Sequence, residues 1–239
     1  MRKKLMKIYK KRWHLAITLL IVLFPFLFFL VFSGLANIPS TKLLLDILIS
    51  GWRLLAAYLI AAVMAWCLAV LFHQEKFAAV ALPIFDVLQS FPTFAALPLA
   101  VFFFGPSNFT IIFFLVLTVI WPILFSIVSS LKLIRQDWEE AAIMSRLSGL
   151  DYLRYFLWPV SVTGLITGSI IGLGEGWEAL VATEIIVGIK TGLGSFFQQF
   201  SNNANVTIFG ILGFLALIFS INKLVWLPLL EWGHHETEE

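Results

Sequence analysis

The segment "FTIIFFLVLTVIWPILFSIVSSL", residues 109–131, is a long apolar run with no charged side chain. A soluble helix of this length keeps a polar face, whereas a helix that crosses a bilayer needs about 20 consecutive, mostly apolar residues. Strands of a membrane barrel would alternate between apolar and polar positions, and this run does not. The segment therefore predicts a membrane-spanning α-helix.

The composition of the whole chain agrees with this prediction. Of 239 residues, 60% are hydrophobic and only 13% are charged, whereas charged residues make up about 25% of an average soluble domain. No polar segment is long enough for a separate soluble domain. The net charge of +2 is too small to indicate nucleic-acid binding, and the single cysteine, Cys67, cannot form an intrachain disulfide. The composition predicts an all-α integral membrane protein.

The chain contains six candidate spans, at residues 13–36, 43–72, 77–104, 109–131, 155–187 and 206–230. A basic segment (1–12) and a polar tail (231–239) flank a single transmembrane domain, 13–230. Pro83, Pro92 and Pro98 predict kinks in the third span, because proline cannot donate a helical hydrogen bond.

The basic residues orient these spans. Residues 1–12 carry seven basic residues and no acid, so the positive-inside rule places the N-terminus in the cytoplasm. Six spans then return the C-terminus to the same side. A cleaved signal peptide is the alternative for the N-terminal segment; the long apolar run and the lack of a good cleavage site favour an uncleaved span.

A polar stretch separates the fourth and fifth spans: "EEAAIMSRLSGLDYLRYFLWP", residues 139–159. Asp137 and Glu140 have the spacing of a capping box, which predicts a short helix through about residue 147. Gly149 can end that helix in a left-handed conformation. A second short helix is expected from the Ser148–Asp151 pair to about residue 157. Pro159 then suits the first turn of the fifth span. The sequence predicts two short helices on the cytoplasmic side, within residues 137–158.

This stretch resembles the cytoplasmic loop of permease subunits of binding-protein-dependent ABC importers. Glu140, Ala141 and Ala142 match the family's Glu-Ala-Ala triplet, and Pro159 lies at the family's distance from it. Arg146 occupies the place of the family's glycine, which moves the expected bend about one turn further on, to Gly149. Trp158 replaces the usual leucine before the proline. Four further segments resemble the nitrate, sulfonate, taurine and bicarbonate group in the same order: "LPLAVFFFG" (97–105), "WPILFSIVSSLK" (121–132), "ATEIIVG" (182–188) and "GLG" (192–194).

The resemblance implies a type I importer permease in the plasma membrane of a bacterium or archaeon. It also implies that the loop, through Glu140, Ala141, Ala142, Arg146, Gly149 and Pro159, seats on a separate ATPase subunit that binds ATP and magnesium. A second permease copy or paralogue and an extracytoplasmic binding protein that delivers a small solute complete the implied assembly. The chain itself has no G-x-x-x-x-G-K-[ST] phosphate loop and is expected to be a transport subunit, with no cofactor or metal of its own and no enzymatic activity.

Ionisable groups within the predicted spans are candidates for the translocation pathway. They are Asp86 and Gln89 on the third span and Glu175, Glu178 and Glu184 on the fifth. Glu175 and Glu178 share one face. Internal ion pairs that fix helix packing, for example Glu184 with Lys223, are the alternative explanation. Three acids on one span suit a cationic or proton-bearing substrate better than a bare anion.

Small residues form a stripe on the fifth span, where glycine recurs every fourth residue at Gly164, Gly168, Gly172 and Gly176. Such stripes let helix backbones approach closely in lipid, which predicts a packing contact.

Two other classes of protein fit the sequence less well. An intramembrane enzyme would need a nucleophile–base pair or a metal cluster, and the sequence shows neither. A proton-coupled secondary transporter that uses Glu175 and Glu178 remains the alternative, although the inverted repeats typical of many such transporters are not evident.

Overall fold

The computed structural model describes residues 40–73, 75–134, 136–226 and 228–229, together with scattered positions between 17 and 35. The predicted first span, residues 13–36, lies mostly outside the described residues. The basic segment 1–12 and the tail 231–239 lie wholly outside them.

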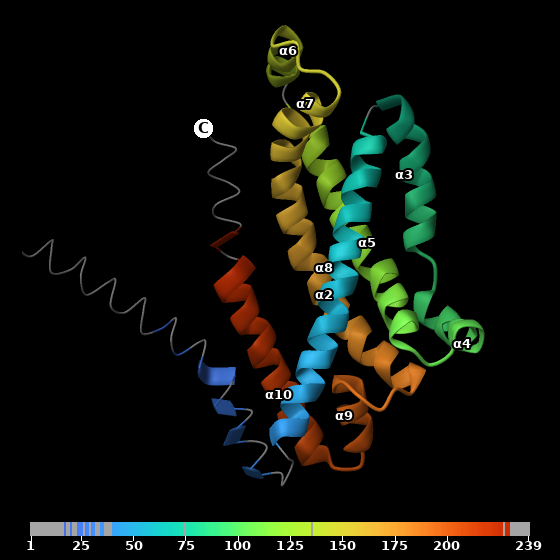
Figure 1. Ribbon diagram of the computed structural model, residues 1–239, viewed down its shortest axis with the longest axis vertical. Helices are drawn as coiled ribbons and strands as arrows, with labels where there is room; N and C mark the ends of the chain where they lie inside the picture. Colours follow the sequence, from blue (N-terminus) through green and yellow to red (C-terminus); the bar gives the residue numbers. More distant parts are fainter. Residues whose placement is uncertain are drawn as a thin grey trace, which may run out of the picture.

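The described part of the chain is built from helices (Figure 1). In chain order these are α2 (Ser40–Leu71), α3 (Glu75–Gln89), α4 (Thr93–Phe104), α5 (Asn108–Lys132), α6 (Gln136–Met144), α7 (Leu150–Tyr152), the π-helical segment η1 (Leu153–Leu157), α8 (Trp158–Val187), α9 (Leu193–Gln199), α10 (Ala204–Ile221) and the π-helical segment η2 (Asn222–Trp226).

Four of the described helical stretches are long and apolar enough to cross a membrane: Thr41–Leu71, Asn108–Lys132, Leu150–Val187 and Ala204–Trp226. A fifth candidate is the pair α3 and α4, which is bent by 76° at the break between Gln89 and Thr93. Pro92 stands directly before α4, whereas Pro83 and Pro98 lie inside helices. The all-α membrane architecture is thus confirmed, while the count of six spans stays a prediction because the first lies mostly outside the described residues.

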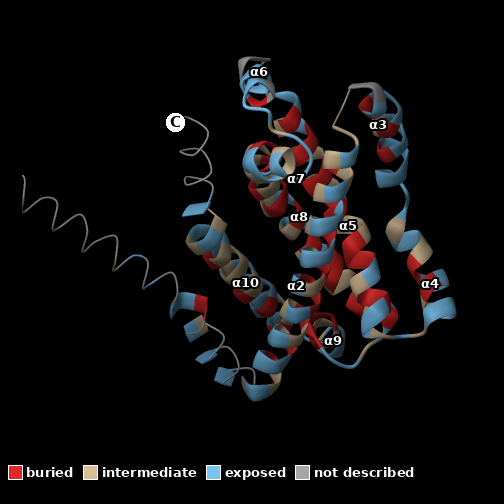
Figure 2. Cartoon of the chain, turned by 45° about the horizontal axis from the view of Figure 1, so that its top comes forward, coloured by how far each residue is buried: buried red, intermediate tan, exposed pale blue. Residues whose placement is uncertain are grey.

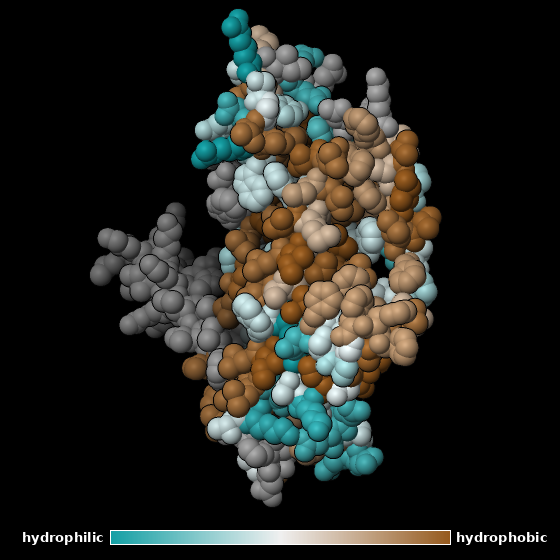
Figure 3. All heavy atoms as spheres, turned by 45° about the vertical axis from the view of Figure 1, so that its right-hand side comes forward, coloured by the Kyte–Doolittle hydropathy of each residue, from teal (hydrophilic) through white to brown (hydrophobic). Residues whose placement is uncertain are grey.

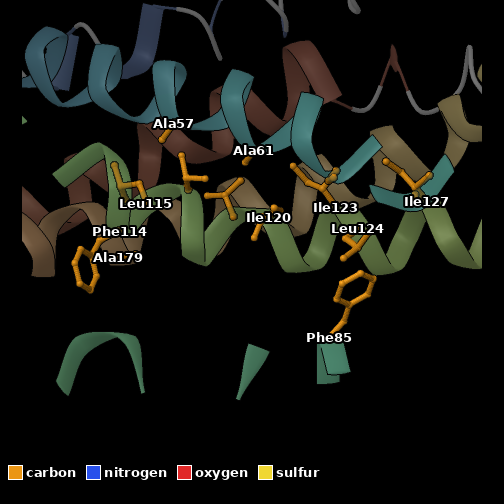
Figure 4. Close-up of a cluster of buried hydrophobic side chains, with 14 of the residues drawn as sticks. Ala57, Ala61, Phe85, Phe114, Leu115, Ile120, Ile123, Leu124, Ile127 and Ala179 are labelled. Atoms are coloured by element: carbon orange, nitrogen blue, oxygen red, sulfur yellow. The ribbon is translucent and has the colours of Figure 1, made fainter. Parts of the chain in front are cut away.

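Helix α5 forms the centre of the bundle, packed between α2 and α8 (Figures 1 and 2). Most of its buried side chains are large and aliphatic. They face an alanine stripe on α2, where Ala57, Ala61, Ala65 and Ala69 recur every fourth residue and have no exposed surface. Figure 4 shows Ala57 and Ala61 above Leu115 and Ile120, with Phe85 of α3 reaching the core from the opposite side. Small residues on α2 and large ones on α5 interdigitate, so the two backbones come close together.

The outer faces of the bundle carry many exposed large apolar side chains. Figure 3 shows a broad apolar band over the middle of one face, with hydrophilic residues gathered mainly toward the two ends. An exposed apolar band between two more hydrophilic ends suits contact with lipid. The chain is therefore a multi-pass membrane protein.

Candidate functional site

Helix α6 projects from one end of the bundle, and α9 lies at the other end (Figure 1). Helix α6 already begins at Gln136, one residue before Asp137, and the side chain of the predicted cap, Asp137, lies outside what the structure describes. The helix ends at Met144, about one turn before the predicted end near residue 147. The Leu147 amide then donates to the Ala142 carbonyl at 3.2 Å, which is the hydrogen bond of a Schellman turn.

That turn places Arg146 in the left-handed conformation, with φ of +54°. Glycine favours this conformation because it has no Cβ to clash, and Arg146 stands where the resembled family has its glycine. The bend at the end of α6 therefore falls at the family's position, and the predicted shift by one turn is wrong. Gly149 also has a positive φ, of +57°, and immediately precedes α7.

The second predicted short helix is wrong as a separate element. Residues Leu150–Val187 form one continuous helical stretch of α7, η1 and α8. Pro159 cannot donate a hydrogen bond to the preceding turn, and the wider π-helical segment Leu153–Leu157 lies immediately before it. The Trp158 amide donates five residues back, to the Leu153 carbonyl, as that wider winding requires. The second half of the polar loop is thus part of the long helix.

The projecting loop exposes apolar as well as polar side chains. Met144 is 83% exposed and Leu150 is 82% exposed, and Trp138 is also exposed. Within the Glu-Ala-Ala triplet, Ala141 is exposed and Ala142 is buried against the bundle. Exposed apolar side chains at a polar end of a membrane protein are typical of a surface that contacts another protein.

A hollow of about 530 Å³ opens beside the break between α3 and α4. It brings together two of the predicted pathway residues, Gln89 of α3 and Glu175 of α8. Asp86 lies next to the hollow and accepts a hydrogen bond from Gln89 at 3.2 Å. Glu178 shares the exposed side of α8 with Glu175 but does not line the hollow. The other lining residues are Thr93, Phe94, Leu117, Thr118, Trp121, Pro122, Phe125, Ser126 and Ile171.

Glu184 forms a buried ion pair near the α9 end of the bundle. Its carboxylate contacts the Arg53 guanidinium of α2, and the two side chains are 0% and 2% exposed. The predicted partner, Lys223, was therefore wrong. Ser50 of α2 also donates to the carboxylate, at 2.8 Å, and the Gly194 amide donates to it at 2.8 Å. A fully buried carboxylate with this many donors is held in one position.

The same polar face of α2 also binds the segment between α8 and α9. The Gly192 amide donates to Asp46 and the Leu193 amide to Ser50, each at 2.8 Å. Arg53 donates to the Thr191 carbonyl at 2.9 Å and to Asn108 at the start of α5 at 2.9 Å. Asp46, Ser50 and Arg53 are spaced to lie on one helical face, and this spacing is the signal in the sequence that indicates the polar face of α2.

The "GLG" segment is explained by these contacts. Gly192 has φ of +106°, and a Cβ there would lie 2.5 Å from a carboxylate oxygen of Glu184. A Cβ on Gly194 would lie 2.7 Å from the Val181 carbonyl oxygen. Both glycines let the backbone approach the buried ion pair closely.

The glycine stripe of α8 lies against α5 for most of its length. A Cβ on Gly168 would lie 2.6 Å from the Ile123 Cα and 2.8 Å from the Pro122 carbonyl oxygen. A Cβ on Gly172 would lie 3.0 Å from the Val119 carbonyl oxygen. A Cβ on Gly164 would also overlap atoms of α5. A Cβ on Gly176 would overlap side chains of both α2 and α5.

Comparison with known proteins places these features in context. Residues 57–225 match the family described as "Binding-protein-dependent transport system inner membrane component". The nitrate import permease protein NrtB of Leptolyngbya laminosa is 32% identical over 176 residues, which cover 72% of this chain and 63% of the relative. The taurine transport system permease protein TauC of Escherichia coli is 32% identical over 157 residues, or 62% of this chain and 57% of the relative. The bicarbonate transport system permease protein CmpB of Synechococcus elongatus is 28% identical over 145 residues, or 60% and 52%. The chain thus spans less than two thirds of the length of these relatives.

Proposed function

The chain belongs to the family of binding-protein-dependent transport system inner membrane components, and from this premise we propose that it is the permease subunit of an ABC importer. In this role it forms the pathway through which a small solute crosses the membrane. The observation that carries the proposal is the family match over residues 57–225, which includes both the projecting loop and the hollow beside Glu175.

The implied partners follow from this role. A separate ATPase subunit binds ATP and magnesium, a second permease copy or paralogue completes the membrane part, and a binding protein delivers the solute from outside. The exposed face of the loop, with Ala141 beside Met144 and Leu150, supports contact with the ATPase. A small side chain at Ala141 lets a partner surface approach the α6 backbone closely.

The continuous helix supplies a mechanical link between loop and pathway. Leu150 lies at the loop and Glu175 lies at the hollow on the same helical stretch, roughly 37 Å apart at 1.5 Å per residue. A displacement of the loop by the ATPase would therefore move the Glu175 wall of the hollow directly. In this arrangement the chain contributes no catalysis, and the energy comes from nucleotide bound elsewhere.

Substitution of Ala141 tests this role. We expect Ala141→Arg to release the ATPase or to uncouple ATP hydrolysis from transport, because a long charged side chain would separate the two surfaces. Ala141→Ser is the matched control, since it keeps the small size. The measurements are co-purification with the ATPase and transport by the reconstituted complex. An Ala141→Arg complex that stays intact and transports at the normal rate would contradict the proposal.

A further inference from the structure

The hollow beside the α3–α4 break is lined by both aromatic and acidic side chains. Three aromatic rings line it, those of Phe94 on α4 and of Trp121 and Phe125 on α5. Among the described residues that line the hollow, Glu175 is the only charged one. The remaining polar groups are an amide, on Gln89, and hydroxyls that can donate or accept hydrogen bonds.

We propose that this hollow receives the positively charged group of a small organic cation or amine-bearing solute. The inference rests on the proposed function, because it names the substrate class of the same pathway. An aromatic ring attracts a cation placed over its face, and the carboxylate of Glu175 adds a direct Coulombic attraction. A small inorganic anion would meet a carboxylate and no lining cation among the described residues.

The surroundings of the hollow strengthen this preference. Asp86 lies beside Gln89 and orients its amide through the hydrogen bond between them. Glu178 lies one turn from Glu175 on α8. Both acids add negative potential around the hollow, although neither lines it. The volume of about 530 Å³ lies within the usual range for small-molecule sites.

Protection of an introduced cysteine from labelling tests the proposal on the purified full-length chain. Cys67 is replaced by alanine, and Thr118 in the hollow by cysteine. Modification by a small neutral thiol reagent is then followed with tetraethylammonium or with nitrate as the probe, at matched ionic strength. We expect tetraethylammonium to slow the modification and nitrate to leave it unchanged.

Substitutions then identify the groups responsible. Glu175→Gln should raise the half-protecting concentration of tetraethylammonium about fivefold, the loss expected from one partly exposed charge pair. Phe94→Leu should weaken protection in the same direction. Glu178→Gln is the matched control on the same helix and should have a smaller effect, because its side chain does not line the hollow.

The outcomes separate this inference from the proposed function. Protection by nitrate but not by tetraethylammonium, or an equal effect of Glu175→Gln and Glu178→Gln, would overturn the substrate class while the permease role stands. Labelling in the isolated chain needs no ATPase, so failure of the chain to assemble with an ATPase would count against the proposed function alone.

Discussion

At the scale of single residues, the buried pair of Arg53 and Glu184 is the most consequential feature. Removing two charges from water is costly, and the cost is recovered only when the geometry and the remaining hydrogen bonds are good. Here the guanidinium also donates to Asn108 and Thr191, and the carboxylate also accepts from Ser50 and Gly194. The pair therefore joins α2, α5 and α8 to the segment that leads into α9.

Breaking this pair is expected to destabilise the protein strongly. Glu184→Gln leaves the Arg53 charge buried without its counter-ion, at a cost of about 3 kcal/mol or more in the free energy of unfolding. Thermal unfolding in detergent measures this loss. Glu178→Gln serves as the control, because it changes an exposed acid on the same helix and should leave the midpoint nearly unchanged. Equal midpoints for the two variants would show that the ion pair does not stabilise the fold.

At the scale of helices, the contact between α8 and α5 depends on the absence of side chains along one stripe. A Cβ on Gly164 or Gly168 would overlap the α5 backbone, and a Cβ on Gly172 would lie in tight contact with it. The complementary contact between α2 and α5 uses alanines at the same four-residue spacing. Helix association in lipid relies on such close packing, because the hydrophobic effect does not distinguish a neighbouring helix from lipid tails.

The same substitution at two glycines of α8 should therefore have different effects on stability. Gly168→Ala is expected to lower stability by about 1–3 kcal/mol, because its Cβ would overlap α5. Gly174→Ala has no atom within 4 Å of the new Cβ and should be neutral or slightly stabilising, because alanine is the better helix former. Thermal unfolding of the two variants side by side checks this. A stabilising Gly168→Ala would show that the seam is looser than the structure indicates.

At the scale of the whole molecule, the projecting loop and α9 lie at opposite ends of the bundle (Figure 1). Under the positive-inside rule, the excess of basic residues on the loop side predicts that this end faces the cytoplasm. The α9 end, with its segment bound to Arg53 and Glu184, would then face the side from which a binding protein delivers the solute.

Cysteine labelling in right-side-out vesicles tests this orientation. In a background without Cys67, we expect Asn202→Cys near α9 to react with an impermeant thiol reagent added outside. Ser145→Cys in the projecting loop should react only after the membrane is opened. Both positions are exposed in the structure, so a difference in labelling reports the side of the membrane. Outside labelling of Ser145→Cys alone would reverse the topology.

Much of the architecture could be predicted because it follows from local properties of the chain. Apolar runs, basic flanks and the glycine spacing are readable without knowing which helices touch, and they predict spans, orientation and a packing face. The hollow was partly predictable: Gln89 and Glu175 stood out as polar groups in apolar spans. The aromatic rings of Phe94, Trp121 and Phe125 could not be distinguished in the sequence from the many other aromatic residues that face lipid or core.

Two features could be identified only from the packed structure: which charged side chains pair with each other, and where one helix continues into the next. The sequence offers several basic residues as possible ion-pair partners of Glu184. The packing of α2 against α8 places Arg53, and not Lys223, beside its carboxylate. Capping signals suggested a separate helix before Pro159, but a π-helical turn lets the helix continue through it, since the cost of a missing hydrogen bond is met by a local change of winding. Arg146 adopts a conformation that glycine favours because the turn after α6 must close on Ala142. Sequence patterns report each residue's own preference, whereas the pairing of residues far apart in the chain depends on how whole helices pack.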